Sequence, residues 1–128
     1  MSMKIIWITG RRLGVDLASS TELGLCKSLS KGNQISMISP GESRVAEIHS
    51  HYIVPQSNFR GFQSVSVGRN ANTILKSEGL IDWADVCLVD WRIVGSVYKM
   101  LIKRGCPWCI IDRGPPADSG LVARLQRI

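Results

Sequence analysis

The stretch Lys4–Ser39 constrains the fold more than any other part of the chain. It opens on Lys4–Thr9, a short run of consecutive large apolar residues that favours a strand buried on both faces. A helix follows, with an apolar stripe at helical spacing formed by Leu23, Cys26 and Leu29. Gln34–Ser39 then reads as a second strand. Strand, helix and strand in this order predict a βαβ unit with parallel strands and a right-handed crossover.

Both ends of this helix carry sequence signals. Ser19 and Glu22 have the spacing of a capping box, in which the serine hydroxyl accepts from a first-turn amide and the glutamate reaches back. Gly32 stands where a residue in the left-handed conformation ends a helix. Gly10–Gly14 is then the loop that joins the first strand to the helix.

The rest of the chain continues the alternation of strands and helices. Further strands are predicted at Ile48–Val54, Ser64–Val67, Ala84–Trp91 and Trp108–Ile111. Further helices are predicted at Asn70–Glu78, Arg92–Arg104 and Ser119–Ile128. This pattern predicts an α/β fold, a Rossmann-like open and mostly parallel sheet with helices on both faces. Residues 1–128 are expected to form one such domain, and the last helix reaches Ile128 without a cap, which indicates a truncated piece of a longer protein.

Composition narrows the class of partner. Lys and Arg number 16 against 10 Asp and Glu, and the net charge of +6 favours an anionic partner such as phosphate groups, anionic lipid head groups or nucleic acid. No apolar run approaches the roughly 20 residues of a membrane span. The chain enters a strand within a few residues of its start, which is not the pattern of a secretory signal. We expect a cytoplasmic protein.

The cysteines and histidines indicate packing more than chemistry. Cys26 and Cys87 fall in apolar elements and are interpreted as core residues. Cys106 and Cys109 form a CxxC pair, but it follows a helix and enters a strand, whereas a redox pair begins a helix. His49 and His51 alternate and would face the same side of a short strand, but a metal site there lacks an obvious third ligand. No metal site is predicted.

In open α/β sheets, ligands bind beyond the carboxyl ends of the strands, which selects three clusters here. The first is the loop with Gly10, Arg11, Arg12 and Gly14. It matches neither a dinucleotide-binding fingerprint nor a P-loop. Its backbone amides and arginines suit an anionic or polyhydroxyl group, and the alternative is a solvated basic turn.

The other two clusters follow later strands. Asp90 and Trp91 close the Ala84–Trp91 strand, where a carboxylate can act as a general base or cap the next helix, and the residues alone favour the cap. Asp112 and Arg113 follow the last strand, where an ion pair and a binding role are equally compatible with the sequence.

Several of these features resemble the N-terminal domain of GT-B glycosyltransferases, in particular family 4. The resemblance rests on KIIWITGRRLG, on LCKSLSKGNQISMISPGE and on the strand ADVCLVDW. Positions that fall on the family's helix-to-strand pattern are Leu25, Leu29, Gly32, Ile35, Ile38, Ser39 and Pro40. Asn33 replaces the usual histidine and Gln34 an often-found glutamate. Asp90 occupies the place of the family's catalytic histidine.

The resemblance implies transfer of a sugar from a nucleotide-sugar donor to a sugar, lipid or other hydroxyl acceptor. This chain would be the acceptor-side domain, with the donor-binding C-terminal domain absent, and it would be inactive alone. Asp90 would be the base, and Gly10, Arg11, Arg12, Gly14, Trp91, Asp112 and Arg113 would contact substrate. No cofactor, metal or nucleic acid is implied, and the site would work in the cytoplasm or at the inner membrane face.

One alternative is a non-catalytic Rossmann-like module that binds a nucleotide or another anion and regulates a partner. A receiver-like signalling domain is a third candidate, but it needs an acidic cluster after the first strand, where this chain has Arg11 and Arg12.

Overall fold

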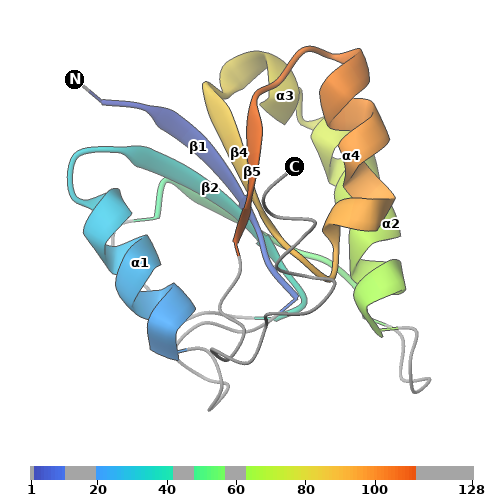
Figure 1. Ribbon diagram of the computed structural model, residues 1–128, viewed down its shortest axis with the longest axis horizontal. Coiled ribbons are helices and arrows are strands. Elements are labelled where there is room, and N and C mark those ends of the chain that lie inside the picture. The colour runs from blue at the N-terminus through green and yellow to red at the C-terminus, as the bar shows by residue number, and fades with distance from the viewer. Residues whose placement is uncertain (1, 11–19, 42–47, 57–62, 112–128) are drawn as a thin grey trace, which may run out of the picture.

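The computed structural model describes residues 2–10, 20–41, 48–56 and 63–111. Its sheet is open and wholly parallel, with the strand order β3-β2-β1-β4-β5. The strands are β1 (Lys4–Ile8), β2 (Gln34–Ser39), β3 (Ser50–Ile53), β4 (Val86–Asp90) and β5 (Trp108–Ile111). The helices are α1 (Ser20–Ser30), α2 (Gln63–Ser77), α3 (Leu80–Trp83) and α4 (Val94–Lys103). The Rossmann-like α/β fold expected from the sequence is confirmed (Figure 1).

Helices cover both faces of the sheet, α1 on one side and α2 with α4 on the other (Figure 1). Successive residues of β1 therefore enter different cores. Ile5 and Trp7 belong to the core shared with α1, while Ile6 and Ile8 belong to the core shared with α2 and α4. Side chains alternate between the faces of a strand, so a strand covered on both sides needs the unbroken apolar run seen here.

The α1 segment carries the features expected of it, with one addition. Gly32 has φ +107°, the left-handed conformation expected after the helix, and Cys26 is buried. Glu22 is also buried, and its Oε1 accepts a hydrogen bond from Trp7 Nε1 at 3.0 Å. The carboxylate thus ties the helix to β1, a contact that the capping-box spacing does not reveal. Ser19, the predicted cap, lies outside the described residues.

The predicted strand Ser64–Val67 is wrong, because these residues lie inside α2. Val65 and Val67 alternate with serines, which is the pattern of a short strand. Over a longer window Val67, Ala71 and Leu75 recur every four residues and are all buried. This stripe packs on the sheet and on α4, and tertiary packing overrides the local preference of β-branched residues. The helix predicted at Asn70–Glu78 is the second half of α2.

A close approach of α2 and α4 depends on Gly68. A Cβ built on Gly68 would lie 2.4 Å from Ser96 Cβ and 2.7 Å from Ser96 Oγ. Beside this contact, Asn72 Nδ2 donates to Ser96 O at 2.6 Å. Only glycine allows the two helices to lie this close, so the layer on this face of the sheet is fixed by one residue of α2.

The order of the strands sets where a ligand can bind. The chain leaves β1 through α1 to β2 on one side, and later returns from β3 through α2 and α3 to β4 on the other side of β1. The direction of winding reverses between β1 and β4. Such a switch point opens a crevice at the carboxyl ends of the two strands, which is the usual ligand site of an open α/β sheet.

Candidate functional site

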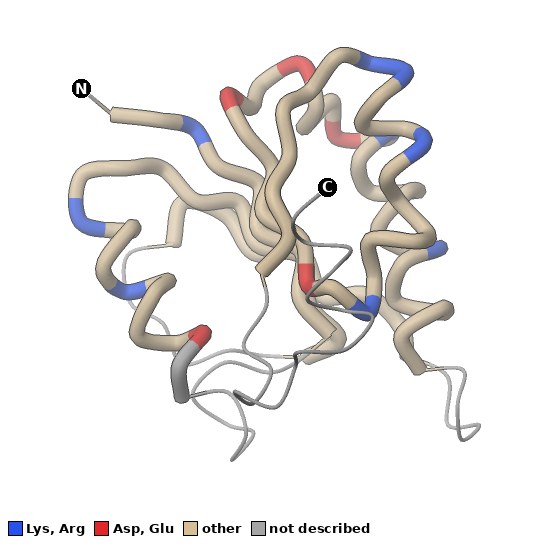
Figure 2. Tube along the Cα trace, viewed as in Figure 1, with Lys and Arg blue, Asp and Glu red and all other residues tan. Residues whose placement is uncertain are grey.

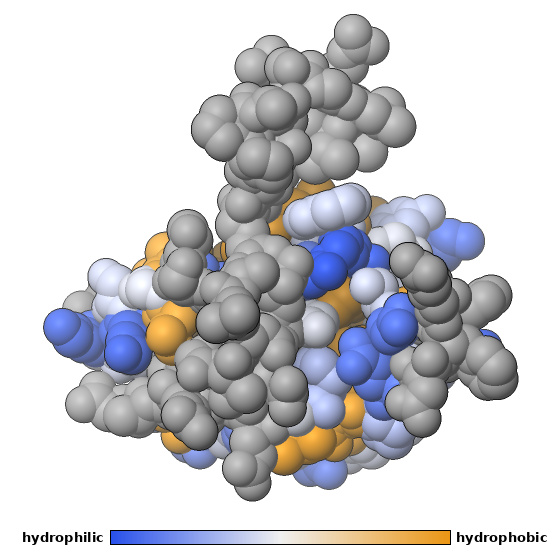
Figure 3. Space-filling view, turned by 90° about the horizontal axis from the view of Figure 1, so that it is seen from below, coloured by the Kyte–Doolittle hydropathy of each residue, from blue (hydrophilic) through white to orange (hydrophobic). Residues whose placement is uncertain are grey.

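The ends of β1 and β4 meet at this switch point. Gly10, two residues beyond β1, donates its backbone N–H to Asp90 Oδ2 at 3.2 Å, and Asp90 is the last residue of β4. Figure 3 views the molecule from the edge where the strands end. Gly10 and Asp90, which belong to two of the clusters selected from the sequence, are thus in contact.

Asp90 organises the turn between β4 and α4. Its Oδ1 accepts from Arg92 N at 3.1 Å, and its Oδ2 accepts from Arg92 Nη2 at 3.1 Å as well as from Gly10. The Asp90 side chain is only 6% exposed. The amide that Asp90 Oδ1 binds lies in the turn before α4, and Ile93, the N-cap of α4, makes no side-chain cap. The predicted helix cap is therefore an Asx turn that precedes the helix. A carboxylate has about four acceptor positions, of which this network fills three.

Gly10 has little room for a side chain. A Cβ at this position would lie 3.3 Å from Ile93 Cδ1, 3.5 Å from Asp90 Oδ2 and 3.8 Å from Arg92 Nη2. Gly10 therefore allows the chain leaving β1 to pass directly over the β4 turn. A larger residue would push it away from Asp90 and lengthen the hydrogen bond between them.

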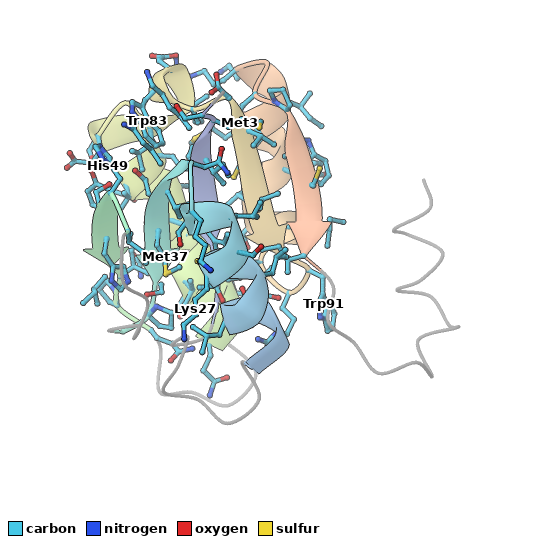
Figure 4. The ribbon with its side chains drawn as sticks, turned by 90° about the vertical axis from the view of Figure 1, so that its left-hand side faces the viewer. Met3, Lys27, Met37, His49, Trp83 and Trp91 are labelled. Carbon is cyan, nitrogen blue, oxygen red and sulfur yellow. The ribbon has the colours of Figure 1, made fainter. Side chains whose placement is uncertain are left out.

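Trp91 lies beyond the strand ends. Its backbone N–H donates to Ile111 O at 3.4 Å, which ties the β4 turn to the end of β5. The side chain is 39% exposed, and Figure 4 shows it below the tips of β4 and β5, away from the body of the sheet. An exposed tryptophan at this edge offers an apolar face on which a ring could stack.

Arg92 belongs to the same cluster, and sequence reasoning missed it. Its guanidinium pairs with Asp90, and its side chain is 30% exposed. The Nε atom is buried and has no hydrogen-bond partner among the described residues. A signal for this residue was present in the sequence, since a basic residue two positions after an aspartate at a strand end can fold back on that aspartate.

The remaining predicted site residues, Arg11, Arg12, Gly14, Asp112 and Arg113, lie outside the described residues. The strands that precede them are described. β1 and β5 are the two neighbours of β4 in the sheet, and their described ends, Gly10 and Ile111, lie beside the Asp90 turn. The structure thus brings Gly10, Asp90 and Trp91 to the same edge of the sheet, and a binding role of all eight residues stays a prediction.

The histidines do not converge on a common centre. His49 stacks on Trp83 of α3, with ring centroids 5.6 Å apart and 11° between the planes (Figure 4). His51 Nε2 lies 2.6 Å from Ser39 Oγ, which also donates to Gly41 O at 2.6 Å. Within the described ranges, no three His, Cys, Asp or Glu side chains are placed to hold a metal ion.

The cysteines of the CxxC pair differ in environment. Burial raises the pKa of the Cys106 thiol, and this side chain joins the core shared with α2 and α4. Cys109 is exposed and lies opposite Leu88 in the pairing of β5 with β4. Burial also raises the pKa of Cys87, and it raises that of Cys26 to about 12 together with the nearby charge of Glu22. Three of the four cysteines are buried, as the packing interpretation predicts, whereas Cys109 is exposed.

No protein-family model, curated protein or solved structure matches this chain. The fold itself defines the class, an open parallel α/β protein of Rossmann-like topology with its strand-end cluster at the switch point. Among the described helices, none combines the length and the apolar character needed to cross a membrane.

Proposed function

We propose that this chain is the acceptor-side domain of a glycosyltransferase of GT-B architecture, similar to family 4. The observation that carries the proposal is the contact between Gly10 N and Asp90 Oδ2 at the switch point. Gly10, the first residue of the predicted glycine- and arginine-bearing loop, thus lies beside the end of β4, where the family has its catalytic residue. Substrate would lie along this edge, beside Gly10, Asp90 and Trp91.

In the proposed reaction, the acceptor hydroxyl attacks the anomeric carbon of the donor sugar and the nucleotide leaves with the bonding electron pair. The hydroxyl proton passes to a base. Asp90 is our candidate, because three hydrogen bonds hold its carboxylate in place and leave about one acceptor position for the hydroxyl. A second domain, not part of this chain, would bind most of the nucleotide-sugar donor.

Charge distribution supports a small or membrane-bound acceptor over a nucleic acid. Lysines and arginines of the described residues occur on β1, on α1, α2 and α4 and in the turns beside these helices, and do not form one patch (Figure 2). A nucleic-acid surface concentrates cations in a patch or stripe. We therefore propose a hydroxyl acceptor in the cytoplasm or at the inner face of the membrane.

A second candidate, a nucleotide- or anion-binding module without catalysis, draws on the same cluster. Asp90 is nearly enclosed, and it stabilises the turn through two backbone amides, Gly10 N and Arg92 N. This is what a purely structural aspartate would do. Binding measurements distinguish the two candidates, because a complete nucleotide module binds nucleotides without help.

The test is calorimetry on the 128-residue chain with UDP-glucose, GDP-mannose, free nucleotides and a panel of glycosides and sugar phosphates. An acceptor-side domain binds members of the acceptor panel, binds nucleotide sugars weakly or not at all, and transfers no radiolabelled sugar alone. Tight unaided binding of a nucleotide would favour the second candidate. Sugar transfer by the isolated chain would overturn the division of labour proposed here.

A further inference from the structure

β5 is the outermost strand of the sheet beyond β4 (Figure 4). Pro107 O and Ile111 O accept hydrogen bonds from backbone amides of β4 and its turn, at 2.9 and 3.4 Å, so both carbonyl groups point toward β4. The polar groups of successive residues in a strand point to opposite sides. The N–H and C=O groups of Trp108 and Ile110 therefore point away from β4, and among the described residues no strand pairs with them.

This edge lacks the features with which proteins usually prevent the addition of another strand. Charged side chains, prolines and bulges are the common protections of an edge. β5 reads WCII, without a charge or a proline, and its pairing with β4 runs without a bulge. The other edge strand, β3, reads SHYI and is followed by Pro55. Of the two edges, β5 is therefore the better template for a new strand.

The helix beside this edge adds an apolar side. α2 approaches α4 at Ser96, which lies against Gly68. At 3.6 residues per turn, Tyr98 and Ile102 lie about 200° and about 240° around the helix from Ser96, on the side away from α2. Ile102 is 60% exposed. Figure 1 looks onto this edge of the molecule, with β5 and α4 toward the viewer.

A second copy of the chain matches the edge. In an antiparallel pair centred on Cys109, Trp108 lies opposite Ile110 of the copy, and Ile110 lies opposite Trp108 of the copy. Each of these pairs exchanges two hydrogen bonds, so all the outward-pointing groups of Trp108 and Ile110 are used. The two-fold axis is perpendicular to the sheet and brings the Ile102 sides of the two α4 helices toward each other. The contact is closed, because the same patch is used on both copies.

Charge and sequence favour this occupant. Lys103 and Arg104 precede β5, and an antiparallel pair sets those of the two copies at opposite ends, roughly 30 Å apart along the strands. A parallel partner would set like charges side by side. The chain's own sequence after Ile111, DRGPPAD, is a poor strand for this edge, because consecutive prolines lack the donors that a ladder needs.

We propose that this chain forms a homodimer in which the β5 strands of two copies pair antiparallel and the two α4 helices lie side by side. The inference is independent of the proposed function. The strand ends of the two copies point in opposite directions, so the switch-point clusters with Gly10 and Asp90 lie far apart and stay open. Four ladder hydrogen bonds and one side of a helix make a small interface, so the dimer is weak and depends on protein concentration.

Sedimentation equilibrium of the 128-residue chain, from about 10 μM to about 1 mM, tests the inference. Ile102→Lys and Ile53→Lys form a matched pair, because both isoleucines are exposed and Ile53 lies on the opposite edge strand, β3. Ile102→Lys brings like charges together across the axis and should lower the association constant about tenfold or more, and Ile53→Lys should change it less than about twofold. Ile110→Pro removes an outward N–H that β4 does not use, and should also weaken the dimer about tenfold. Circular dichroism of each variant verifies the fold.

Cys109 reports the register of the pair. Its backbone groups face β4, so the two Cys109 residues form a pair without mutual hydrogen bonds, with Cα atoms about 4.5 Å apart. A short bismaleimide should therefore link two copies through this exposed thiol, and Ile102→Lys, which retains the thiol, should reduce the linked product. A monomer over the whole concentration range, equal weakening by the two lysine variants, or a dimer whose Cys109 thiols are not linked overturns the inference.

Discussion

The packing of α2 on α4 gives the sharpest test of the fold, through the substitution Gly68→Ala. The new Cβ would lie 2.4 Å from Ser96 Cβ, whereas carbon atoms in contact lie about 3.5–4.0 Å apart. The helices must move apart by about 1 Å, and overpacking of this kind costs about 1–3 kcal/mol. The obstacle is a Cβ attached to the backbone of α4, which cannot rotate away, so we take the upper end of that range.

Alanine is also a better helix former than glycine, which offsets about 1 kcal/mol of this loss in stability. The expected net loss in the free energy of unfolding is therefore about 2 kcal/mol, measured by urea denaturation followed by circular dichroism. Gly24→Ala in α1 is the matched control, because a Cβ there meets nothing within 4 Å, and this variant should gain up to about 1 kcal/mol. Adding Ser96→Gly should recover the part of the loss due to the clash. Equal stability of the Gly68→Ala and Gly24→Ala proteins would refute the packing described for α2 and α4.

Three further predictions concern single side chains. Glu22→Leu leaves the buried Trp7 N–H without its acceptor and should cost about 1–3 kcal/mol in urea denaturation, whereas Glu22→Gln keeps an acceptor and should cost less. At pH 8 a thiol reagent should modify Cys109 rapidly and leave Cys26 unreacted, because the Cys26 pKa is about 12, and Cys109→Ser should abolish the fast phase. Asp90→Ala removes three hydrogen bonds at the switch point and should lower the unfolding free energy by about 1–3 kcal/mol; an unchanged urea midpoint would contradict its role in the turn.

Short segments rich in apolar residues located β1, β2 and β5 to within one residue. Gln34–Ser39 and Trp108–Ile111 match β2 and β5 residue for residue, and Lys4–Thr9 extends one residue beyond β1. An uninterrupted apolar run has few other solutions in a chain of this length. Ala84–Trp91 overshoots β4 at both ends, because Ala84 is the C-cap of α3 and Trp91 lies in the turn before α4.

Other elements could not be identified from local patterns. The first half of α2 resembles a strand, and its helical stripe emerges only over the span from Val67 to Leu75. The single turn of α3 is too short to show a helical period. The order of the strands depends on which side of β1 each crossover returns, and that choice is made by tertiary packing.

The sequence indicated which strand ends lie together at the candidate site but not the hydrogen bonds that join them. The rule for open sheets selected Gly10, Asp90 and Trp91 together, and the structure brings Gly10 and Asp90 into contact. What the sequence could not show is that the Asp90 carboxylate accepts both from the Gly10 amide, beyond the end of β1, and from an amide of its own turn. Arg92 was missed for the same reason, because its position depends on that carboxylate.

The most direct test of a ligand site at the β1–β4 switch point is amide chemical-shift mapping of the ¹⁵N-labelled chain during titration with glucose 1-phosphate. The largest shifts among the described residues should fall on Gly10 and on residues 90–93, with the indole resonance of Trp91 moving in step. Saturable shifts centred on β3 or on the outer face of α2, with Gly10 and residues 90–93 unmoved, would place the ligand elsewhere and contradict the account.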